Sequence, residues 1–321
     1  MARLFGFIAN RPDILARVAA HEARLLVEPN PGKSLGWGIG FYQGGEVLLR
    51  RRPVDDRPTV DLSIALSDVR TDVAIGHVRS ATVGAQSTEN THPFRYRQWL
   101  FAHTGTVAAF ASMRDRLAES IPQFLRRNVR GETDSELLFH LFLSFLHDAG
   151  KLGDAEVPTA AVTTALRSSL ALVDRLSQEE GVDPSPLNLI VTSGDALIAV
   201  HARGKMHTRT FRGREDLDEI LGDDAALRAR LPDFATTVAT VLVAETTQPV
   251  PRFTEVPNRS IVIVPRGADP IVSPLLRASR RRVRATFRRV RHDRRLRARR
   301  AAPRRRRERP CVCSAPRVGG A

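Results

Sequence analysis

The sequence predicts an α+β fold in which stacked β-sheets are covered by helices, followed by a separate basic tail. Three observations lead to this prediction. Apolar strand-like segments recur through residues 3–265, long helical patterns are grouped between them, and the composition changes near Leu276. Sheets and helices bury their apolar faces by packing in layers. We therefore expect one domain over residues 2–275 and a disordered, Arg-rich tail over residues 276–321.

The strands are predicted from short apolar runs bounded by turn residues. They are expected at Arg3–Ala9, Trp37–Tyr42, Val47–Arg51, Asp72–His77, Trp99–His103, Leu187–Thr192, Ala196–His201, Thr236–Ala244 and Ser260–Pro265. Two pairs of strands flank glycine-containing turns, Gln43–Glu46 and Ser193–Asp195. Because glycine tolerates the positive φ of a tight turn, both pairs are predicted hairpins.

Three segments carry apolar residues at helical spacing, namely Met113–Leu125, Ser135–His147 and Ala160–Gln178. Thr133 and Asp134 precede the second of them and are suitable cap residues. The three segments are therefore predicted helices, and they stand between two groups of strands.

The composition of the chain indicates in which cellular compartment the protein is expected. No run of 18 apolar residues is present, so no membrane span is expected, and the N-terminus lacks the features of a secretory signal. The two cysteines, Cys311 and Cys313, lie in the last eleven residues. Without a disulfide framework, a cytoplasmic location is expected. The spacing of these cysteines does not suit a zinc site, and we expect neither a metal nor a cofactor.

The basic charge of the chain is concentrated in its tail. Residues 277–321 contain 19 Arg, no Lys and two acidic residues, an excess of +17. Because the whole chain carries +15, the remaining residues carry −2 and are close to neutral. The tail could bind nucleic-acid phosphates or an anionic membrane surface, or could be an extension without function.

Six blocks of residues stand in a fixed order along the chain. They are Met1–Gly6 (MARLFG), Gly36–Gly40 (GWGIG), Gly76–Gly84 (GHVRSATVG), Asn90–Phe94 (NTHPF), Phe101–Thr106 (FAHTGT) and Thr133–Glu136 (TDSE). In this order and spacing they resemble the class II, N-terminal-nucleophile glutamine amidotransferases, and more closely their small bacterial branch. The resemblance covers residues 2–270.

The resemblance implies an Ntn-hydrolase fold, a four-layer αββα sandwich of two antiparallel sheets. In this family the thiolate of an N-terminal cysteine, exposed once Met1 is removed, attacks the side-chain amide of glutamine. The free α-amine acts as base, ammonia leaves, and water releases glutamate from a thioester. Such catalysis needs a nucleophile next to its base and donors aimed at the developing oxyanion.

Two positions depart from the family pattern. Ala2 occupies the nucleophile position, and its methyl group cannot attack a carbonyl. Loss of a nucleophile in a comparable covalent hydrolase lowers turnover by about 10⁶. The Asn-Gly pair that forms the oxyanion site in the family is here Thr104 and Gly105. Loss of one such donor lowers turnover by roughly 10²–10³.

Two residues that hold the substrate in the family are retained. Arg79 matches the arginine that pairs with the α-carboxylate of glutamine, a role that suits the forked guanidinium. Asp134 matches the carboxylate that holds the α-amino group. From the residues alone, Arg79 could instead be a surface arginine, and Asp134 a helix cap or both cap and ligand.

The remaining motif residues have structural interpretations. His77 and His103 lie among apolar residues and are predicted to be core histidines with hydrogen-bond partners. Gly36, Gly38 and Gly40 are predicted to allow close packing of a sheet, because they do not open a helix as a phosphate-binding loop does.

The favoured hypothesis is a degenerate glutamine amidotransferase that keeps a pocket for glutamine or a related amino acid and serves as a ligand sensor or partner subunit. One alternative is an amide hydrolase in which the α-amine of Ala2 activates water. The other is a nucleic-acid-binding protein that uses the Arg-rich tail.

Overall fold

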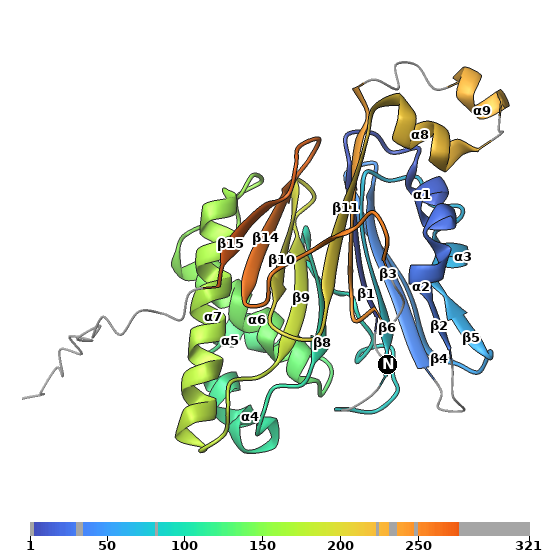
Figure 1. Ribbon diagram of the computed structural model, residues 1–321. Coiled ribbons are helices and arrows are strands. Elements are labelled where there is room, and N and C mark those ends of the chain that lie inside the picture. The colour runs from blue at the N-terminus through green and yellow to red at the C-terminus, as the bar shows by residue number, and fades with distance from the viewer. Residues whose placement is uncertain are drawn as a thin grey trace, which may run out of the picture. The chain divides into compact units, whose positions relative to one another are not determined.

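The computed structural model describes residues 3–29, 35–80, 83–222, 225–230, 236–246 and 250–275. Two large antiparallel sheets pack face to face, and helices cover the outer face of each (Figure 1). This arrangement confirms the predicted αββα sandwich. Ala2 and the predicted tail, residues 276–321, lie outside the described residues.

Thirteen strands in the described part of the chain form the two sheets. In spatial order the seven-stranded sheet consists of β13 (Thr254–Glu255), β11 (Met206–Arg212), β12 (Val238–Ala244), β1 (Arg3–Ala9), β6 (Val73–Arg79), β3 (Leu35–Gln43) and β4 (Glu46–Asp55). The six-stranded sheet consists of β15 (Ile271–Pro274), β14 (Ser260–Pro265), β10 (Ala196–His201), β9 (Leu187–Thr192), β8 (Trp99–Gly105) and β7 (Phe94–Tyr96). A small pair, β2 (Val27–Pro29) and β5 (Thr59–Asp61), stands apart. Both predicted hairpins, β3–β4 and β9–β10, are confirmed.

The helices are divided between the outer faces of the two sheets. The seven-stranded sheet is covered by α1 (Leu15–His21), α2 (Ala23–Leu26), α3 (Leu62–Leu66) and α8 (Gly213–Leu221). The six-stranded sheet is covered by α4 (Phe110–Glu119), α5 (Gln123–Arg126), α6 (Asp134–Asp148) and α7 (Thr159–Glu179). The short helix α9 (Ala225–Arg230) follows α8.

One predicted helix is wrong in its extent. The structure divides Met113–Leu125 into α4 and α5, and Pro122 is the N-cap of α5. Proline lacks an N–H donor and clashes with the preceding helical turn, so α4 ends before it. The other two helices agree with prediction, and the hydroxyl of Thr133 accepts a hydrogen bond from the Glu136 N–H as the N-cap of α6.

β1 illustrates why the central strands of the sandwich are continuous apolar segments in the sequence. Leu4 contacts the core between the two sheets, whereas Phe5 contacts the core beneath α1, α3 and α8. Successive side chains point to opposite faces, and both faces of this strand are covered. Gly6 faces the second sheet, where a Cβ atom would lie 3.1 Å from Cδ1 of Ile190. Glycine at this position allows the close approach of the sheets.

The predicted packing role of the glycines in β3 is confirmed. A Cβ atom on Gly36 would lie 2.7 Å from the carbonyl oxygen of Pro53, and one on Gly38 would overlap the carbonyl oxygen of His92. None of these glycines has the positive φ that would indicate a turn. β3 therefore accepts the close approach of the segment that precedes β7.

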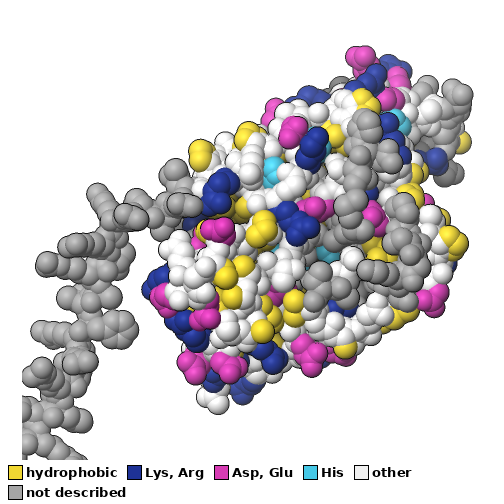
Figure 2. Space-filling model, turned by 60° about the horizontal axis from the view of Figure 1, so that its bottom comes forward, with side chains coloured by type: hydrophobic (Ala, Val, Ile, Leu, Met, Phe, Trp, Pro, Cys, Tyr) yellow, Lys and Arg dark blue, Asp and Glu magenta, His cyan; other side chains and the backbone are white. Residues whose placement is uncertain are grey.

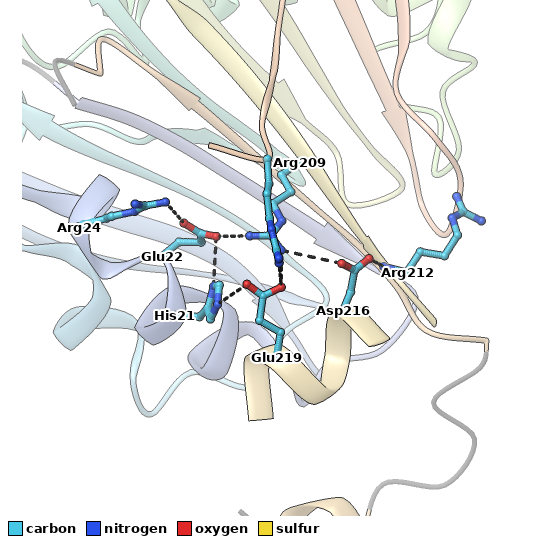
Figure 3. A network of polar contacts seen from close by, with 8 residues as sticks. His21, Glu22, Arg24, Arg209, Arg212, Asp216 and Glu219 are labelled. Carbon is cyan, nitrogen blue, oxygen red and sulfur yellow. Dashed lines mark hydrogen bonds and ion pairs between the residues drawn. The ribbon is translucent and has the colours of Figure 1, made fainter. Parts of the chain in front are cut away.

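A network of charged side chains connects α8 to α1 and to β11 (Figure 3). Nη1 of Arg209 donates to Oε1 of Glu22 at 2.7 Å, and Nη2 donates to Oε2 of Glu219 at 3.0 Å. His21 lies between the same two carboxylates, at 3.1 and 3.3 Å. The guanidinium of Arg209 also lies 4.1 Å from the ring centroid of Phe211, in cation–π contact. The buried arginine is thus surrounded by opposite charge and by an aromatic face.

Candidate functional site

A cavity of about 260 Å³ lies at the end of the sandwich where β1 begins and where β6 and β8 end. Its lining residues are His77, Arg79, Ser80, Val83, His92, His103, Thr104, Gly105, Thr106, Thr133, Asp134, Ser135, Arg203 and Glu245. Arg79, Thr104, Gly105 and Asp134, four of the five predicted site residues, border this one cavity. The fifth, Ala2, lies outside the described residues.

The surface at this end of the sandwich carries both signs of charge. Figure 2, which brings this end forward, shows Lys and Arg side chains interspersed with Asp and Glu over the described surface. On this face the described residues present no extended surface of one sign, in agreement with the near-neutral sum for the chain outside the tail.

Arg3 anchors the beginning of β1 at this end. Its side chain is 2% exposed, and Nη2 donates to Oε2 of the buried Glu28 at 2.9 Å. Nη1 donates to the carbonyl oxygen of Glu245 at 3.0 Å. A buried arginine that is paired and hydrogen-bonded holds its backbone firmly, because breaking such a pair leaves a charge without a partner.

Thr104 and Gly105 form the last residues of β8. The hydroxyl of Thr104 is buried and has no hydrogen-bond partner within the described part of the chain. Gly105 has φ of +112°, and a Cβ atom there would lie 2.5 Å from the carbonyl oxygen of Pro186. Only glycine fits this position, so the backbone of Gly105 borders the cavity without a side chain.

Arg79, at the end of β6, is buried and holds the segment that follows it. Nη2 donates to the carbonyl oxygens of Val83 and Gly84, at 2.8 and 3.1 Å, and Nη1 donates to that of Ala85 at 3.2 Å. Burial lowers the pKa of Arg79, and the negative charge of Asp134 opposes this shift. The guanidinium therefore fixes a border of the cavity while lying in the field of Asp134.

Asp134 begins α6 and is 4% exposed. Oδ2 accepts a hydrogen bond from the N–H of Val107 at 2.7 Å, and Oδ1 accepts one from the N–H of Ser135 at 2.8 Å. Nδ1 of His103 lies 2.8 Å from Oγ of Ser135. Asp134 thus joins the start of α6 to the segment after β8, and of the two predicted cap residues Thr133 is the N-cap.

Of the two histidines predicted to be core residues with hydrogen-bond partners, His103 has Ser135 as its partner, whereas His77 departs from the prediction. His77 and His92 are buried with ring centroids 4.2 Å apart, and no ring nitrogen of either has a hydrogen-bond partner among the described residues. Burial lowers the pKa of His77 to about 3, and the charges of His103 and Arg79 act in the same direction. Burial likewise lowers the pKa of His103, against the charge of Asp134. His77 is therefore neutral near pH 7.

Arg203 and Glu245 complete the cavity wall and were not predicted. Nε of Arg203 lies 3.2 Å from Oε1 of Glu245, which also accepts a hydrogen bond from Nδ2 of Asn188 at 2.8 Å. Arg203 stands in the turn after β10, and Glu245 follows β12, so no sequence motif joins them. The positive φ of Glu245, +63°, is not visible in a sequence.

The cavity does not form a metal site within the described residues. Three histidines line it, yet no group of three His, Cys, Asp or Glu side chains in that part of the chain is placed to hold a metal ion. Among the described helices, none is long and apolar enough to cross a membrane.

Comparisons with known proteins agree with this architecture. The family model of the class II glutamine amidotransferases matches residues 1–267. The chain is similar to DUG3 of Saccharomyces cerevisiae, with 30% identity over 223 residues that cover 62% of each protein, and to YafJ of Escherichia coli, with 29% identity over 78% of this chain and 91% of YafJ. Both names describe candidate glutamine amidotransferases. The match spans less than two thirds of the yeast protein.

Two solved structures share the fold. A class II glutamine aminotransferase domain protein from Silicibacter pomeroyi has a TM-score of 0.53 and 19% identity, over 85% of this chain and 98% of that one. A glutamine amidotransferase-type structure from Pseudomonas aeruginosa has a TM-score of 0.54 and 23% identity, over 83% and 98% of the two chains. At these identities the likeness concerns the fold alone.

Proposed function

The chain belongs to the class II glutamine amidotransferase family, and we propose that it binds glutamine without releasing ammonia from it. One observation carries the proposal. Arg79 and Asp134 border the same cavity as Thr104 and Gly105, whereas the family's nucleophilic cysteine is replaced by Ala2. The features that would recognise an amino acid are retained, and the reactive group is not.

Charge supports a zwitterionic ligand. Arg79 and Asp134 offer opposite charges to an α-carboxylate and an α-ammonium, and the low pKa of His77 keeps a further positive charge out of the cavity. A site shielded from water strengthens such interactions. A protein that binds glutamine in this way without consuming it could act as a sensor or as a subunit for a partner protein.

A glutaminase assay separates this proposal from an active hydrolase that uses the α-amine of Ala2. Purified full-length protein, shown by mass spectrometry to lack Met1, is incubated with L-glutamine while glutamate release is followed. We expect no release above that of a heat-denatured sample. Turnover in the wild type that is abolished in Arg79→Ala would refute the proposal.

A further inference from the structure

The cavity wall beside Thr104 carries a second pair of opposite charges, Arg203 and Glu245. In the six-stranded sheet Thr104 lies directly opposite Asn188. The side-chain oxygen of Asn188 accepts a hydrogen bond from the N–H of Arg203 at 3.3 Å, and its amide nitrogen donates to Oε1 of Glu245 at 2.8 Å. Asn188 therefore holds the pair next to the position where the family binds the reacting end of its substrate.

Both backbone polar groups of Glu245 form hydrogen bonds. Its N–H donates to the carbonyl oxygen of Lys205 at 2.9 Å, and its own carbonyl accepts from Arg3 at 3.0 Å. Its φ of +63° lies in the left-handed region, which is unfavourable for a residue with a Cβ atom. A strained residue that is held so completely at the wall of a cavity is a candidate functional residue.

The pair leaves one donor group and one acceptor free to meet a ligand. Oε1 of Glu245 accepts the hydrogen bond from Asn188 and also pairs with Nε of Arg203. The contacts found for this pair among the described residues use Oε1 of Glu245 and the backbone N–H and Nε of Arg203, and none uses Oε2 of Glu245 or the terminal nitrogens of Arg203. Arg79 differs, because both of its terminal nitrogens donate to backbone carbonyls.

A donor beside an acceptor complements a primary carboxamide, whose oxygen accepts and whose NH₂ group donates. We propose that Arg203 and Glu245 bind the side-chain carboxamide of intact glutamine and exclude glutamate, an inference that rests on the proposed function. A γ-carboxylate would have no hydrogen to donate to Glu245 and would be repelled by it. Among the described residues, two cationic and two anionic side chains line the cavity, and this balance also matches a ligand without net charge.

Isothermal titration of the full-length protein with L-glutamine and with L-glutamate tests this inference. We expect the wild type to bind glutamine at least about tenfold more tightly than glutamate. Glu245→Gln removes the repulsion, so the ratio of the two affinities should fall by roughly tenfold, mainly because glutamate binds better. Arg203→Gln removes the charged donors and shortens the side chain, so it should weaken glutamine binding by about tenfold.

Lys205→Gln is the matched control. Like Arg203→Gln, it removes one positive charge from the turn between β10 and β11, but the Lys205 side chain does not line the cavity. Its two affinities should equal those of the wild type. Arg203 is 43% exposed, so Arg203→Gln remains informative even if Glu245→Gln fails to fold.

The outcomes separate the two proposals. Glutamine binding by the wild type, with selectivity unchanged in Glu245→Gln and glutamine affinity unchanged in Arg203→Gln, would overturn the role of Arg203 and Glu245 and leave the proposed function intact. Absence of glutamine binding by the wild type would overturn both.

Discussion

Two clusters of buried polar side chains in this protein differ in how many hydrogen bonds they form. Around Arg209 the guanidinium is bonded to Glu22 and Glu219, and its face lies over Phe211. In the cavity, by contrast, the ring nitrogens of His77 and the hydroxyl of Thr104 are buried without partners in the described part of the chain.

The difference distinguishes a structural cluster from a candidate site. A buried polar group without a hydrogen bond costs free energy, so folding alone favours clusters that satisfy their own members. The Arg209 cluster joins α8 to α1 and comes close to this: its guanidinium is bonded on both terminal nitrogens, and Oε2 of Glu22, without a hydrogen bond among the described residues, lies 3.9 Å from Nη2 of Arg24. The cavity keeps unsatisfied groups beside Arg79 and Asp134, and this arrangement is expected where a polar ligand supplies the missing partners.

The largest expected effect is on the rate of glutamate release from glutamine. The double variant Ala2→Cys/Thr104→Asn restores the family's nucleophile and oxyanion donor, and we expect glutamate release to rise by up to about 10⁶-fold over the wild type. Ala2→Cys alone should remain roughly 10²–10³ slower than the double variant. Glutamate release measured by a coupled assay checks both values. A double variant as inactive as the wild type would mean that the cavity does not hold glutamine in a reactive position.

Removing the charge of Arg209 should lower the free energy of unfolding more than removing the charge of an exposed arginine. Arg209→Ala leaves Glu22 buried without its main partner and is expected to lower the free energy of unfolding by about 3–5 kcal/mol. Arg212→Ala is the matched control, since its pair with Asp269 is exposed and should contribute no more than about 1 kcal/mol. Urea unfolding measures both. Equal small losses would show that the cluster is not structural.

The buried histidine should make stability depend on pH. The folded-state pKa of His77 is about 3, below the unfolded value near 6.5. Between these values the unfolded chain binds the extra proton, so stability is present above pH 6.5 and is lost as pH falls. His77 should account for a loss of about 2 kcal/mol between pH 7 and pH 5. Urea midpoints should show a smaller loss for His77→Gln than for the wild type, and an equal loss would contradict the low pKa.

The smallest expected effects are changes in the free energy of unfolding at two buried threonines. Thr104→Val removes a hydroxyl without a partner and should raise the free energy of unfolding by about 1 kcal/mol. Thr240→Val removes a hydroxyl that lies 3.0 Å from that of Thr210 and should lower it by a similar amount. Thermal or urea unfolding would show opposite signs for the two variants. The same sign in both would remove the distinction between satisfied and unsatisfied groups.

The strands of the two sheets that were predicted could be recognised because each is buried on at least one face and bounded by turn residues. β14 (Ser260–Pro265) agrees with its predicted range, and β1 does as well. β11 was not predicted, because Met206–Arg212 mixes apolar residues with Arg209, which is buried only through its partners on α8 and before α2. Local sequence does not reveal a charge that is neutralised by distant residues.

Residues of the candidate site could be predicted only where they lie in a sequence motif of the family. Arg79, Thr104, Gly105 and Asp134 lie in family blocks and border one cavity. Arg203 and Glu245 are brought to the same cavity by Asn188 and by the order of the strands, which no local pattern encodes. The missing partners of His77 were likewise invisible, because burial can be read from apolar neighbours whereas hydrogen bonding depends on the whole fold.

Calorimetric titration of the full-length protein with L-glutamine tests the central claim most directly, with glutamate measured in the same cell after the titration. We predict saturable binding, no glutamate, loss of binding in Arg79→Ala and unchanged binding in Arg95→Ala, an exposed arginine that does not line the cavity. The absence of binding, or binding accompanied by glutamate, would contradict the claim that this member of the family recognises glutamine without consuming it.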